Sequence, residues 1–509
     1  MNQATPTKLS ATQLLNTVFD AGSFVSWDTA ANEPDLGTAY AAQLALARER
    51  SGVDESVLTG RAAVRGRAVA VIASEFSFLA GSVGQAAAER IVAAVERATR
   101  EGLPLLASPA SGGTRMQEGT PAFLSMISIT DAVRRHKQAG LPYLVYLRHP
   151  TTGGAMASWG SLGHVTAAEP GALLGFLGPR VYELLAGTAF AQGVQVAENL
   201  LRLGIVDAVL PPTDLAEFVD KALRILQPQA DASEIPVGEA FDDDLLTQDV
   251  WESITRSRDV RRPGGRAVIE AADESLVLNG TGQGENEAGI IIALARFGAQ
   301  SCLVIAHDHS SDAATPTFGP ASLREAQRGM RLAEELNLPV VTLIDTPGAE
   351  LSKEAEEGAI SGEIARSLNA LLGTHSPSVS VLLGQGNGGG AIALLPADRT
   401  IAAENAWLSP LPPEGASAIL YRTTEFAAQM AKEQQVSMRH LREMGLVDAV
   451  VTERQDAGAH SAEFISRVAT AIEREIAIAL KIPDVDRVSR RSSKFRALYR
   501  APRLAGRAA

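Results

Sequence analysis

The chain has 509 residues, which exceeds what one hydrophobic core usually serves and suits two domains. Its apolar content of 46% and charged content of 21% are those of a globular protein, and its net charge of −13 argues against non-specific nucleic-acid binding, which needs a basic face. The single cysteine, Cys302, excludes disulfides within the chain and a cysteine-ligated zinc ribbon, and fits a reducing cytosol.

The N-terminal segment lacks the charged-then-apolar order of a signal peptide, and no apolar run reaches the roughly 18 residues of a membrane span. We therefore expect a cytoplasmic protein without a membrane partner. From Lys8 to about Thr59 the pattern is mostly helical. Leu14, Leu15 and Val18 share one helical face before a break at Gly22, and a second helix is predicted at 36–50.

The rest of the first half alternates apolar strands with amphipathic helices. Strands are predicted at 68–73, 103–107 and 144–147, with a helix at 86–100. The second half repeats this order, with strands at 302–306, 340–344 and 379–383 and a helix at 323–336. This alternation predicts an α/β fold with a parallel sheet and ligands at the strand ends.

An internal repeat relates the two halves. Glycines, prolines and one longer motif recur about 235 residues on: Gly84, Pro104 and Gly113 at Gly319, Pro339 and Gly348; Gly154 at Gly390; Gly204–Val209 at Gly445–Val450. We therefore predict two domains of one fold, related by duplication, at 1–227 and 250–509. The segment 228–249 is rich in acidic residues, Ala and Pro and is predicted to be a linker, in which Asp242–Asp244 indicates a solvated loop rather than a metal site.

Glycine turns follow the strands in matched pairs. The first half contains Ser111–Thr114 and Thr151–Ala155, and the second contains Thr346–Ala349 and Gly388–Ala391. Glycine lets a ligand oxygen approach backbone N–H groups closely, and two such turns from neighbouring strands could form an oxyanion hole, where each donor contributes about 3 to 4 kcal/mol. The alternative is that these are only tight strand-to-helix turns.

Other chemistries have weaker support. Gly384–Gly389 fits the dinucleotide-binding pattern G-x-G-x-x-G with Glu404 downstream, but Pro396 leaves a short helix and the first half lacks the pattern. His307–His309 could ligate a metal, although no matching cluster is apparent. There is no G-x-S-x-G motif, and His149 and His164 are predicted to be packed or surface histidines. A site built from backbone donors suits substrates that bring their own base.

The motifs resemble a known family. Ser108–Gly119, Phe76–Gly84 and Gly175–Arg180 are similar to the carboxyltransferase β subunit of bacterial acetyl-CoA carboxylase. Asp345–Ala349 and Pro413–Leu420 are similar to its α subunit, so the chain resembles a β–α fusion over roughly residues 15 to 480. The resemblance implies a crotonase-type fold (ClpP/crotonase superfamily) in each half.

The resemblance also implies a function, which is carboxyl transfer from carboxybiotin to acetyl-CoA to give malonyl-CoA. Gly113, Gly153 and Gly154 are expected to hold the thioester oxygen, and Gly348, Gly390 and Ala391 the ureido oxygen of biotin. Substrate binding is expected at six further residues: Ser111, Gly112, Arg115, Gly178, Arg180 and Gly389.

The expected partners are an acyl-CoA, a biotin carboxylase with a biotin carboxyl carrier protein, and further copies of the chain, at least as a dimer. No covalently bound cofactor and no metal are expected, since the β subunit's four-cysteine zinc ribbon cannot form here. The α-type motif usually has a cysteine where this chain has Ala416.

Several alternatives remain open. They are a decarboxylase component, a carboxylase of propionyl-CoA or longer acyl-CoA, and a non-catalytic assembly paralogue. The basic tail from Arg487 indicates either a solvated helix end or a contact with phosphate or an acidic partner.

Overall fold

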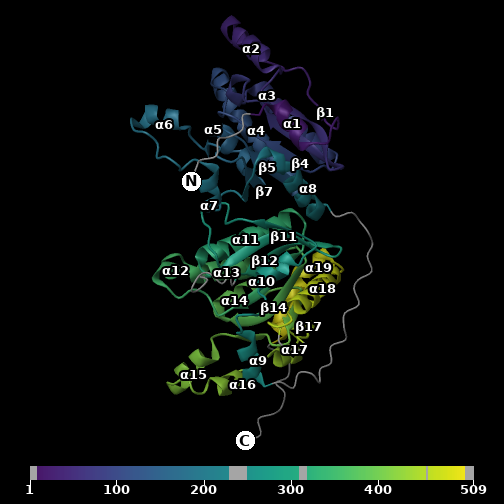
Figure 1. Cartoon of the computed structure of the whole chain (residues 1–509), viewed down its shortest axis with the longest axis vertical. Coiled ribbons are helices and arrows are strands. Elements are labelled where there is room, and N and C mark those ends of the chain that lie inside the picture. Colours follow the sequence, from purple (N-terminus) through teal and green to yellow (C-terminus); the bar gives the residue numbers. More distant parts are fainter. Residues whose placement is uncertain (1–8, 228–248, 309–317, 454–456, 499–509) are drawn as a thin grey trace. The chain divides into compact units, whose positions relative to one another are not determined.

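The computed structural model describes residues 9–227, 249–308, 318–453 and 457–498, which divide into two compact units (Figure 1). Unit 1 comprises Met1–Leu226 and Leu278–Glu285, and unit 2 comprises Gln227–Val277 and Asn286–Ala509. The segment Leu278–Glu285 thus packs with unit 1, although it lies in the range that we assigned to the second domain. All of the predicted linker except Asp249, including its acidic triplet, lies outside the described residues.

Unit 1 is built on a seven-stranded sheet of order β1-β2-β3-β4-β5-β7-β9. Its strands are β1 (Val25–Ser26), β2 (Val57–Val64), β3 (Arg67–Ser74), β4 (Leu105–Ser108), β5 (Tyr143–Leu147), β7 (Val165–Ala168) and β9 (Ala208–Val209). A separate parallel pair is formed by β6 (Thr151–Thr152) and β8 (Leu174–Gly175). From β3 to β9 all neighbours are parallel, whereas β2 and β3 form an antiparallel hairpin.

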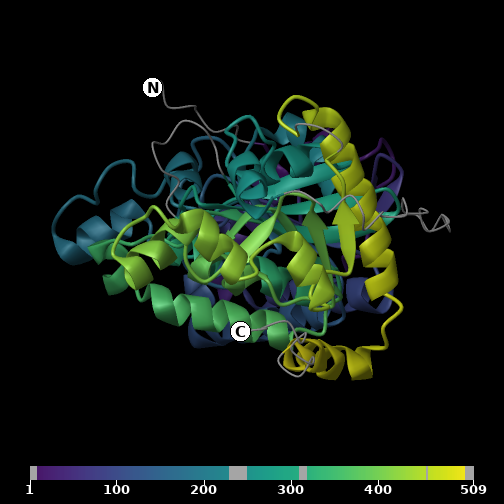
Figure 2. The same ribbon diagram turned by 90° about the horizontal axis from the view of Figure 1, so that it is seen from below.

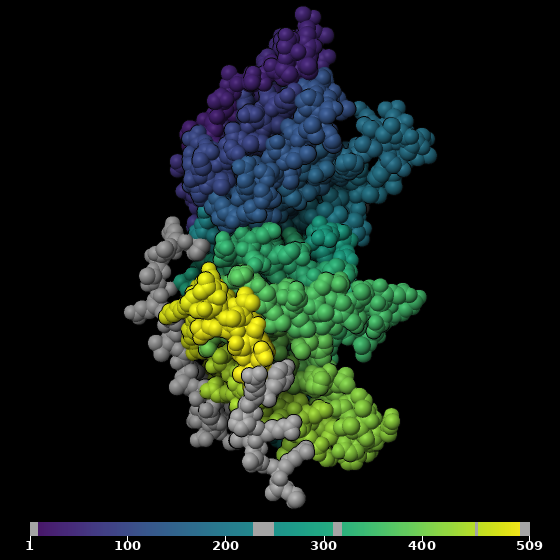
Figure 3. Space-filling view, turned by 180° about the vertical axis from the view of Figure 1, so that it is seen from behind, coloured from purple at the N-terminus to yellow at the C-terminus, as the bar shows by residue number. Residues whose placement is uncertain are grey.

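The helices of unit 1 are α1 (Ala11–Val18), α2 (Thr38–Ser51), α3 (Gln85–Arg100), α4 (Gly119–Gln138), α5 (Gly153–Met156), α6 (Pro179–Ala186), α7 (Ala197–Arg202) and α8 (Leu215–Leu226). α3 and α4 bury an apolar face against the sheet, where Ile91, Val95, Ile129 and Val133 join the core. α6 has no buried residue and projects from the unit, as Figure 3 shows.

Unit 2 contains an eight-stranded sheet of order β10-β11-β12-β13-β14-β15-β17, with β16 beside β14. Its strands are β10 (Glu274–Leu278), β11 (Ile290–Phe297), β12 (Gln300–His307), β13 (Val340–Thr346), β14 (Ser378–Asn387), β15 (Arg399–Ala403), β16 (Trp407–Ser409) and β17 (Ala449–Val451). As in unit 1, one antiparallel hairpin, β11–β12, leads into parallel strands.

Two groups of helices pack against this sheet. α10 (Gly265–Glu270) and α18 (Ser461–Ala479) contact each other, and the long α18 runs along the sheet in Figure 2. α11 (Pro320–Glu335), α13 (Ile360–Gly373) and α14 (Gly388–Leu394) form the other group. The remaining helices are α9 (Val250–Ser257), α12 (Lys353–Glu357), α15 (Pro413–Tyr421), α16 (Ala427–Glu433), α17 (Met438–Glu443) and α19 (Asp484–Ala497).

The strand register repeats between the units. Leu105 of β4 pairs with Tyr143 of β5, and Val340 of β13 pairs with Ser378 of β14, each residue 235 positions after its counterpart. The two sheets are thus two copies of one arrangement. Each predicted strand core is present, but the antiparallel strands β2 and β11 were not predicted.

The first part of the basic tail forms α19 and is bound within its own unit. Arg491 is buried, pairs with Asp398 at 3.0 Å, and donates to the carbonyl oxygens of Leu371 and Thr374 at the end of α13. Lys494 pairs with Asp448 at 2.8 Å. These residues therefore fit neither expectation for the tail; residues 499–509 lie outside the described part. None of the described helices combines the length and apolar character needed to cross a bilayer.

Candidate active site

The two glycine turns of the first half are in contact with each other. Gly113 follows β4 and has φ +108°, and Gly153 begins α5 with φ +61°, both in a region that favours glycine. A Cβ atom on Gly113 would lie 3.1 Å from both the Cα of Gly153 and the nitrogen of Gly154. Glycine is therefore required here by backbone conformation and by the close approach of the two turns.

Most N–H groups of these turns are engaged. The N–H of Gly113 donates to the hydroxyl oxygen of Ser111 at 3.0 Å, and the N–H of Gly153 donates to the carbonyl oxygen of Phe176 at 2.8 Å. Gly112 is exposed, and its N–H donates to the carbonyl oxygen of Ala80 at 2.9 Å. Within the described residues, the N–H groups of Gly154 and Thr114 have no acceptor outside their own helix or turn. These two are the donors open to a ligand.

The second half repeats this arrangement. Gly348 has φ +133°, and its N–H donates to the hydroxyl oxygen of Thr346 at 3.1 Å, as Gly113 does to Ser111. A Cβ on Gly390 would lie 3.2 Å from the nitrogen of Ala349 and 3.3 Å from the carbonyl carbon of Gly348. The turn after β13 and the start of α14 are therefore also in contact.

The open donors of the second half lie at the start of α14. Asn387 is the N-cap, so its carbonyl oxygen accepts the first intrahelical hydrogen bond, from the N–H of Ala391. Ala391 is buried, and Gly389 is half-buried. Outside the helix itself, the N–H groups of Gly389, Gly390 and Ala349 have no acceptor among the residues that the structure describes.

The backbone dihedral angles align the second glycine turns of the two halves one residue away from the alignment that the sequence suggests. Gly388 has φ +59° and begins α14, as Gly153 has φ +61° and begins α5. These two glycines are 235 residues apart, so Gly154 corresponds to Gly389, not to Gly390. The sequence comparison had paired Gly154 with Gly390 because a run of three glycines offers two alignments.

Arg115 lies in a buried ionic cluster rather than at the turn surface. Its side chain is 0% exposed, forms an ion pair with Glu55, and lies 3.3 Å from Glu118. Glu118 also accepts hydrogen bonds from the hydroxyl of Tyr40 and from the N–H of Gln85 at the start of α3. Burial and the hydrogen bond to Glu118 raise the pKa of Tyr40 to about 12. The cluster fixes the turn to α2 and α3.

Gly178 and Arg180 lie away from the glycine turns along the chain, at the start of α6. Gly178 is the N-cap of this helix, and Arg180 is exposed with no ion pair among the described residues. Arg180 is therefore available to an anionic group.

The structure does not favour the dinucleotide and metal alternatives. Gly384 and Gly386 lie inside β14 rather than in a turn, and Glu404 accepts a hydrogen bond from the N–H of Glu453 at 2.8 Å. Asp308 pairs with Arg266 at 2.5 Å, and His309 lies outside the described residues. In the described part of the chain no three His, Cys, Asp or Glu side chains are grouped to hold a metal.

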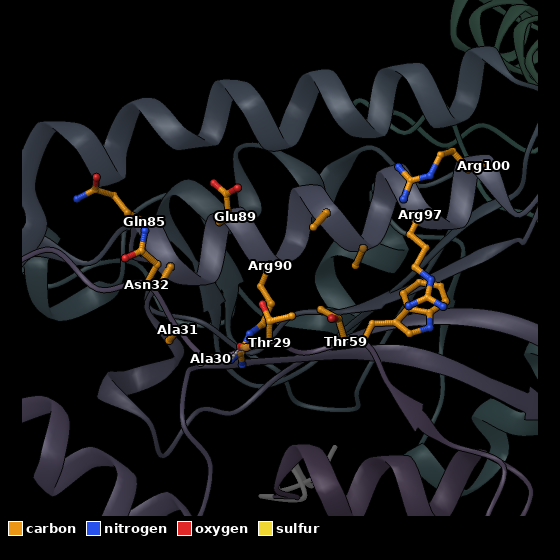
Figure 4. A pocket seen from close by; sticks show the side chains of 14 residues that line it. Thr29, Ala30, Ala31, Asn32, Thr59, Gln85, Glu89, Arg90, Arg97 and Arg100 are labelled. Atoms are coloured by element: carbon orange, nitrogen blue, oxygen red, sulfur yellow. Dashed lines mark hydrogen bonds between the residues drawn. The ribbon is translucent and has the colours of Figure 1, made fainter.

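A hollow of about 480 Å³ lies elsewhere on unit 1, between α3 and residues 27–32 (Figure 4). Three arginines line it. Arg90 pairs with Asp54 at 2.6 Å, Arg97 pairs with Glu101 at 2.7 Å, and Arg100 has no ion pair in the described part of the chain. The hollow shares no residue with the glycine turns, so we assign it no part in the site.

Sequence reasoning missed the side chains that shape the turns. The hydroxyls of Ser111 and Thr346 each bind the N–H two residues on, and Asn387 donates to the carbonyl oxygen of Pro347 at 2.5 Å across the two turns. A signal was present, since Ser, Thr and Asn before a glycine commonly bind nearby backbone groups.

Comparison with known proteins identifies the family of the chain. The carboxyl transferase domain model matches residues 3–496. The chain is 52% identical over 490 residues to a probable biotin-dependent acyl-coenzyme A carboxylase beta3 subunit of Mycobacterium tuberculosis, covering 96% of this chain and 98% of that protein. It is 35% identical to the acetyl-coenzyme A carboxylase carboxyl transferase subunits beta/alpha of Salinispora tropica, covering 96% and 90%.

The fold is also found among solved structures. A transcarboxylase 12S structure with bound methylmalonyl-coenzyme A superposes with a TM-score of 0.71 at 23% identity, covering 91% of this chain and 90% of that one. This likeness concerns the fold alone and confirms the predicted pair of crotonase-like domains. The match of the carboxyl transferase domain model to residues 3–496, with the 52% identity to an acyl-coenzyme A carboxylase beta3 subunit, establishes that the chain belongs to the carboxyl transferase family.

Proposed function

We propose that the chain is the carboxyltransferase component of a biotin-dependent acyl-CoA carboxylase. The observation that carries the proposal is the presence, in each unit, of two glycine turns in contact with open backbone N–H groups. The similarity to acyl-CoA carboxylase β subunits along nearly the full length supports it.

The reaction needs sites for two developing oxyanions. Loss of CO2 from carboxybiotin breaks its N–C bond and leaves negative charge on the ureido oxygen of biotin. Biotin then takes the α proton of the acyl-CoA, and the resulting enolate attacks the CO2. Backbone donors fixed before the reaction stabilise such charges without reorganisation.

We assign the thioester oxygen to unit 1 and the ureido oxygen to unit 2. In unit 1, Gly154 offers an open N–H, while Gly113 and Gly153 let the turns approach each other. In unit 2, Gly389 and Gly390 offer open N–H groups, Gly348 shapes the turn, and Ala391 continues the helix. This division refines the expected roles, since the N–H groups of Gly113 and Gly348 are bound to hydroxyls of their own turns.

Substrate binding divides in the same way. Arg180 is free to meet a phosphate of CoA near Gly178. Ser111 and Gly112 instead hold the turn through hydrogen bonds, and Arg115 is buried in an ion pair with Glu55. Because its side chain is buried, Arg115 would hold the turn in place and would not contact CoA.

For the acyl group we propose acetyl-CoA, which gives malonyl-CoA as an intermediate for fatty acid synthesis. The motifs shared with acetyl-CoA carboxylase β and α subunits support this choice, while propionyl-CoA or a longer acyl-CoA remains the second candidate because the 52% identical relative is named only for acyl-CoA.

We propose a cytoplasmic assembly of at least two copies, in which the first half of one chain meets the second half of another, together with biotin carboxylase and a biotin carboxyl carrier protein. Exposed apolar side chains on both units support association, among them Phe123, Ile127, Leu184, Ile419 and Leu420. The chain would use carboxybiotin from its partner and hold no zinc or covalent cofactor of its own.

The test is carboxylation of acetyl-, propionyl- and longer acyl-CoA by the purified chain with a biotin carboxylase and carrier protein. Preferred turnover of acetyl-CoA is expected. A decarboxylase component would instead transfer from malonyl-type thioesters to biotin without supporting net carboxylation, and a non-catalytic paralogue would do neither. Faster turnover of a longer acyl-CoA would contradict the acetyl assignment alone.

A further inference from the structure

Asn387 lies between the two glycine turns of unit 2. It ends β14, caps α14, and is only 3% exposed. Its side-chain nitrogen donates a hydrogen bond of 2.5 Å to the carbonyl oxygen of Pro347, in the turn after β13. Because a carbonyl oxygen can only accept, this contact fixes which end of the amide is nitrogen.

The other end of this amide is unsatisfied. Its Oδ1 atom is buried and has no hydrogen-bond donor among the described residues. Buried carbonyl oxygens are nearly always paired in folded proteins, so an unpaired one next to a candidate site indicates a donor that the chain does not supply.

There is room beside this amide. Apart from its chain neighbours Pro347 and Ala349, a Cβ placed on Gly348 meets one atom of the described residues within 4 Å, the side-chain nitrogen of Asn387 at 3.4 Å. No side chain other than hydrogen suits that position, because Gly348 has φ +133°. The nitrogen end of the Asn387 amide thus borders the place where a side chain on Gly348 would lie.

The first half has a different residue at this position. Thr152 precedes Gly153 as Asn387 precedes Gly388, and both glycines adopt φ near +60° at the start of a helix. The hydroxyl of Thr152 donates a hydrogen bond of 3.5 Å to the carbonyl oxygen of Ser111. Unit 1 therefore offers no amide oxygen at the place where unit 2 offers an unpaired one.

This difference matches the difference between the two proposed substrates. A thioester has no N–H group beside its carbonyl, whereas the ureido ring of biotin retains one ring N–H when the other nitrogen is carboxylated. We propose that Oδ1 of Asn387 accepts a hydrogen bond from this uncarboxylated ring N–H, an inference that rests on the proposed function. Asn387 then selects the cyclic urea for unit 2, and its absence leaves unit 1 to the thioester.

The test measures carboxyl transfer from malonyl-CoA to free biotin and to a cyclic carbamate analogue, in which oxygen replaces the ring N–H that is not carboxylated. The wild-type chain should prefer biotin by about tenfold in kcat/KM, the cost of an unpaired acceptor. Asn387→Thr copies the residue of the first half, which the same turn accommodates. It should raise KM for biotin and abolish the preference, with a smaller effect on kcat.

Two further variants separate recognition from folding. Asn387→Asp keeps an acceptor oxygen but loses the donor to Pro347, so it should retain a preference for biotin. Asn405 also has a buried side-chain oxygen without a hydrogen-bond partner among the described residues, but it is not part of the glycine turns. Asn405→Ala should therefore keep the wild-type preference for biotin over the carbamate analogue.

The outcomes distinguish this inference from the function on which it rests. A wild-type preference that survives in Asn387→Thr, or is absent from the start, overturns the role of Asn387 and leaves carboxyl transfer standing. No transfer to biotin by the wild-type chain overturns both.

Discussion

Asp207 and Asp448 make the same reciprocal contact in the two units, 241 residues apart. Asp207 accepts from the N–H of Thr166 at 2.8 Å and donates its own N–H to the carbonyl oxygen of Thr166 at 2.7 Å. Asp448 does the same with Thr400, at 2.7 and 2.8 Å. The duplication therefore extends beyond the sheet to the side-chain hydrogen bonds that join its last parallel strands.

Replacement of Gly390 tests the proposed biotin site. Gly390→Val places carbon atoms where even a Cβ would be 3.2 Å from the nitrogen of Ala349, so the two turns must separate. We expect transfer to fall by at least about a hundredfold, the cost of one lost oxyanion donor. Gly373→Val is the control, because a Cβ there meets nothing within 4 Å. Full activity of Gly390→Val, with steady-state carboxylation as the measurement, would refute the assignment.

Removal of Arg115 tests its assignment as a supporting residue. Arg115→Met leaves Glu55 buried without its cation, so the free energy of unfolding should fall by about 3 to 5 kcal/mol in denaturant titrations. Adding Glu55→Gln should recover part of the loss. KM for acyl-CoA should remain close to the wild-type value in the folded fraction. A large rise in KM without loss of stability would instead indicate direct contact with CoA.

His136 should make stability depend on pH. Burial lowers the pKa of this histidine to about 4, below the 6.5 of an unfolded chain. Between these values only the unfolded state binds the proton, so the free energy of unfolding should decrease as pH falls from 6.5 to 4, by up to about 1.4 kcal/mol per pH unit. His136→Gln should flatten this dependence in thermal melts. An unchanged slope in His136→Gln would contradict this origin of the pH dependence.

The docking of α19 can be tested at Arg491. Arg491→Met removes the cation paired with Asp398 and the donors to the carbonyl oxygens that end α13, so about 3 to 5 kcal/mol of stability should be lost from unit 2. The neighbouring Arg490 is exposed, and Arg490→Met should change stability by less than about 0.5 kcal/mol. Limited proteolysis should cut α19 early only in the first variant. Equal cleavage of both variants would show that Arg491 does not hold the helix.

The sequence was sufficient for the strand cores and the glycine turns. Runs such as 68–73 and 340–344 are short, continuous and apolar, as strands buried on both faces of a sheet are, and the glycines at 113 and 348 are needed for their positive φ. The strand β2 was missed because Gly60 and Arg61 interrupt its apolar residues. The alignment of Gly154 was ambiguous for a related reason, since neighbouring glycines are indistinguishable until their dihedral angles are known.

Side-chain direction could not be predicted. Arg115 lies inside a motif that suggests ligand binding, yet its partners Glu55 and Tyr40 are 60 and 75 residues away. Likewise, no pattern reveals that the hydroxyl of Ser111 takes up the N–H of Gly113, because this depends on the turn's geometry. Long-range partners and hydroxyl rotamers are properties of the folded state.

The segment Leu278–Glu285 limits where a gene for this protein could divide. Asn279 donates its N–H to Asp207 at 3.0 Å and its amide to the carbonyl oxygen of Leu201, and Gly282 donates to Gly204 at 2.7 Å. A gene split within 228–249 would therefore place a piece of the first fold on the second polypeptide. The N-terminal product would lack the segment Leu278–Glu285 until the second polypeptide supplied it.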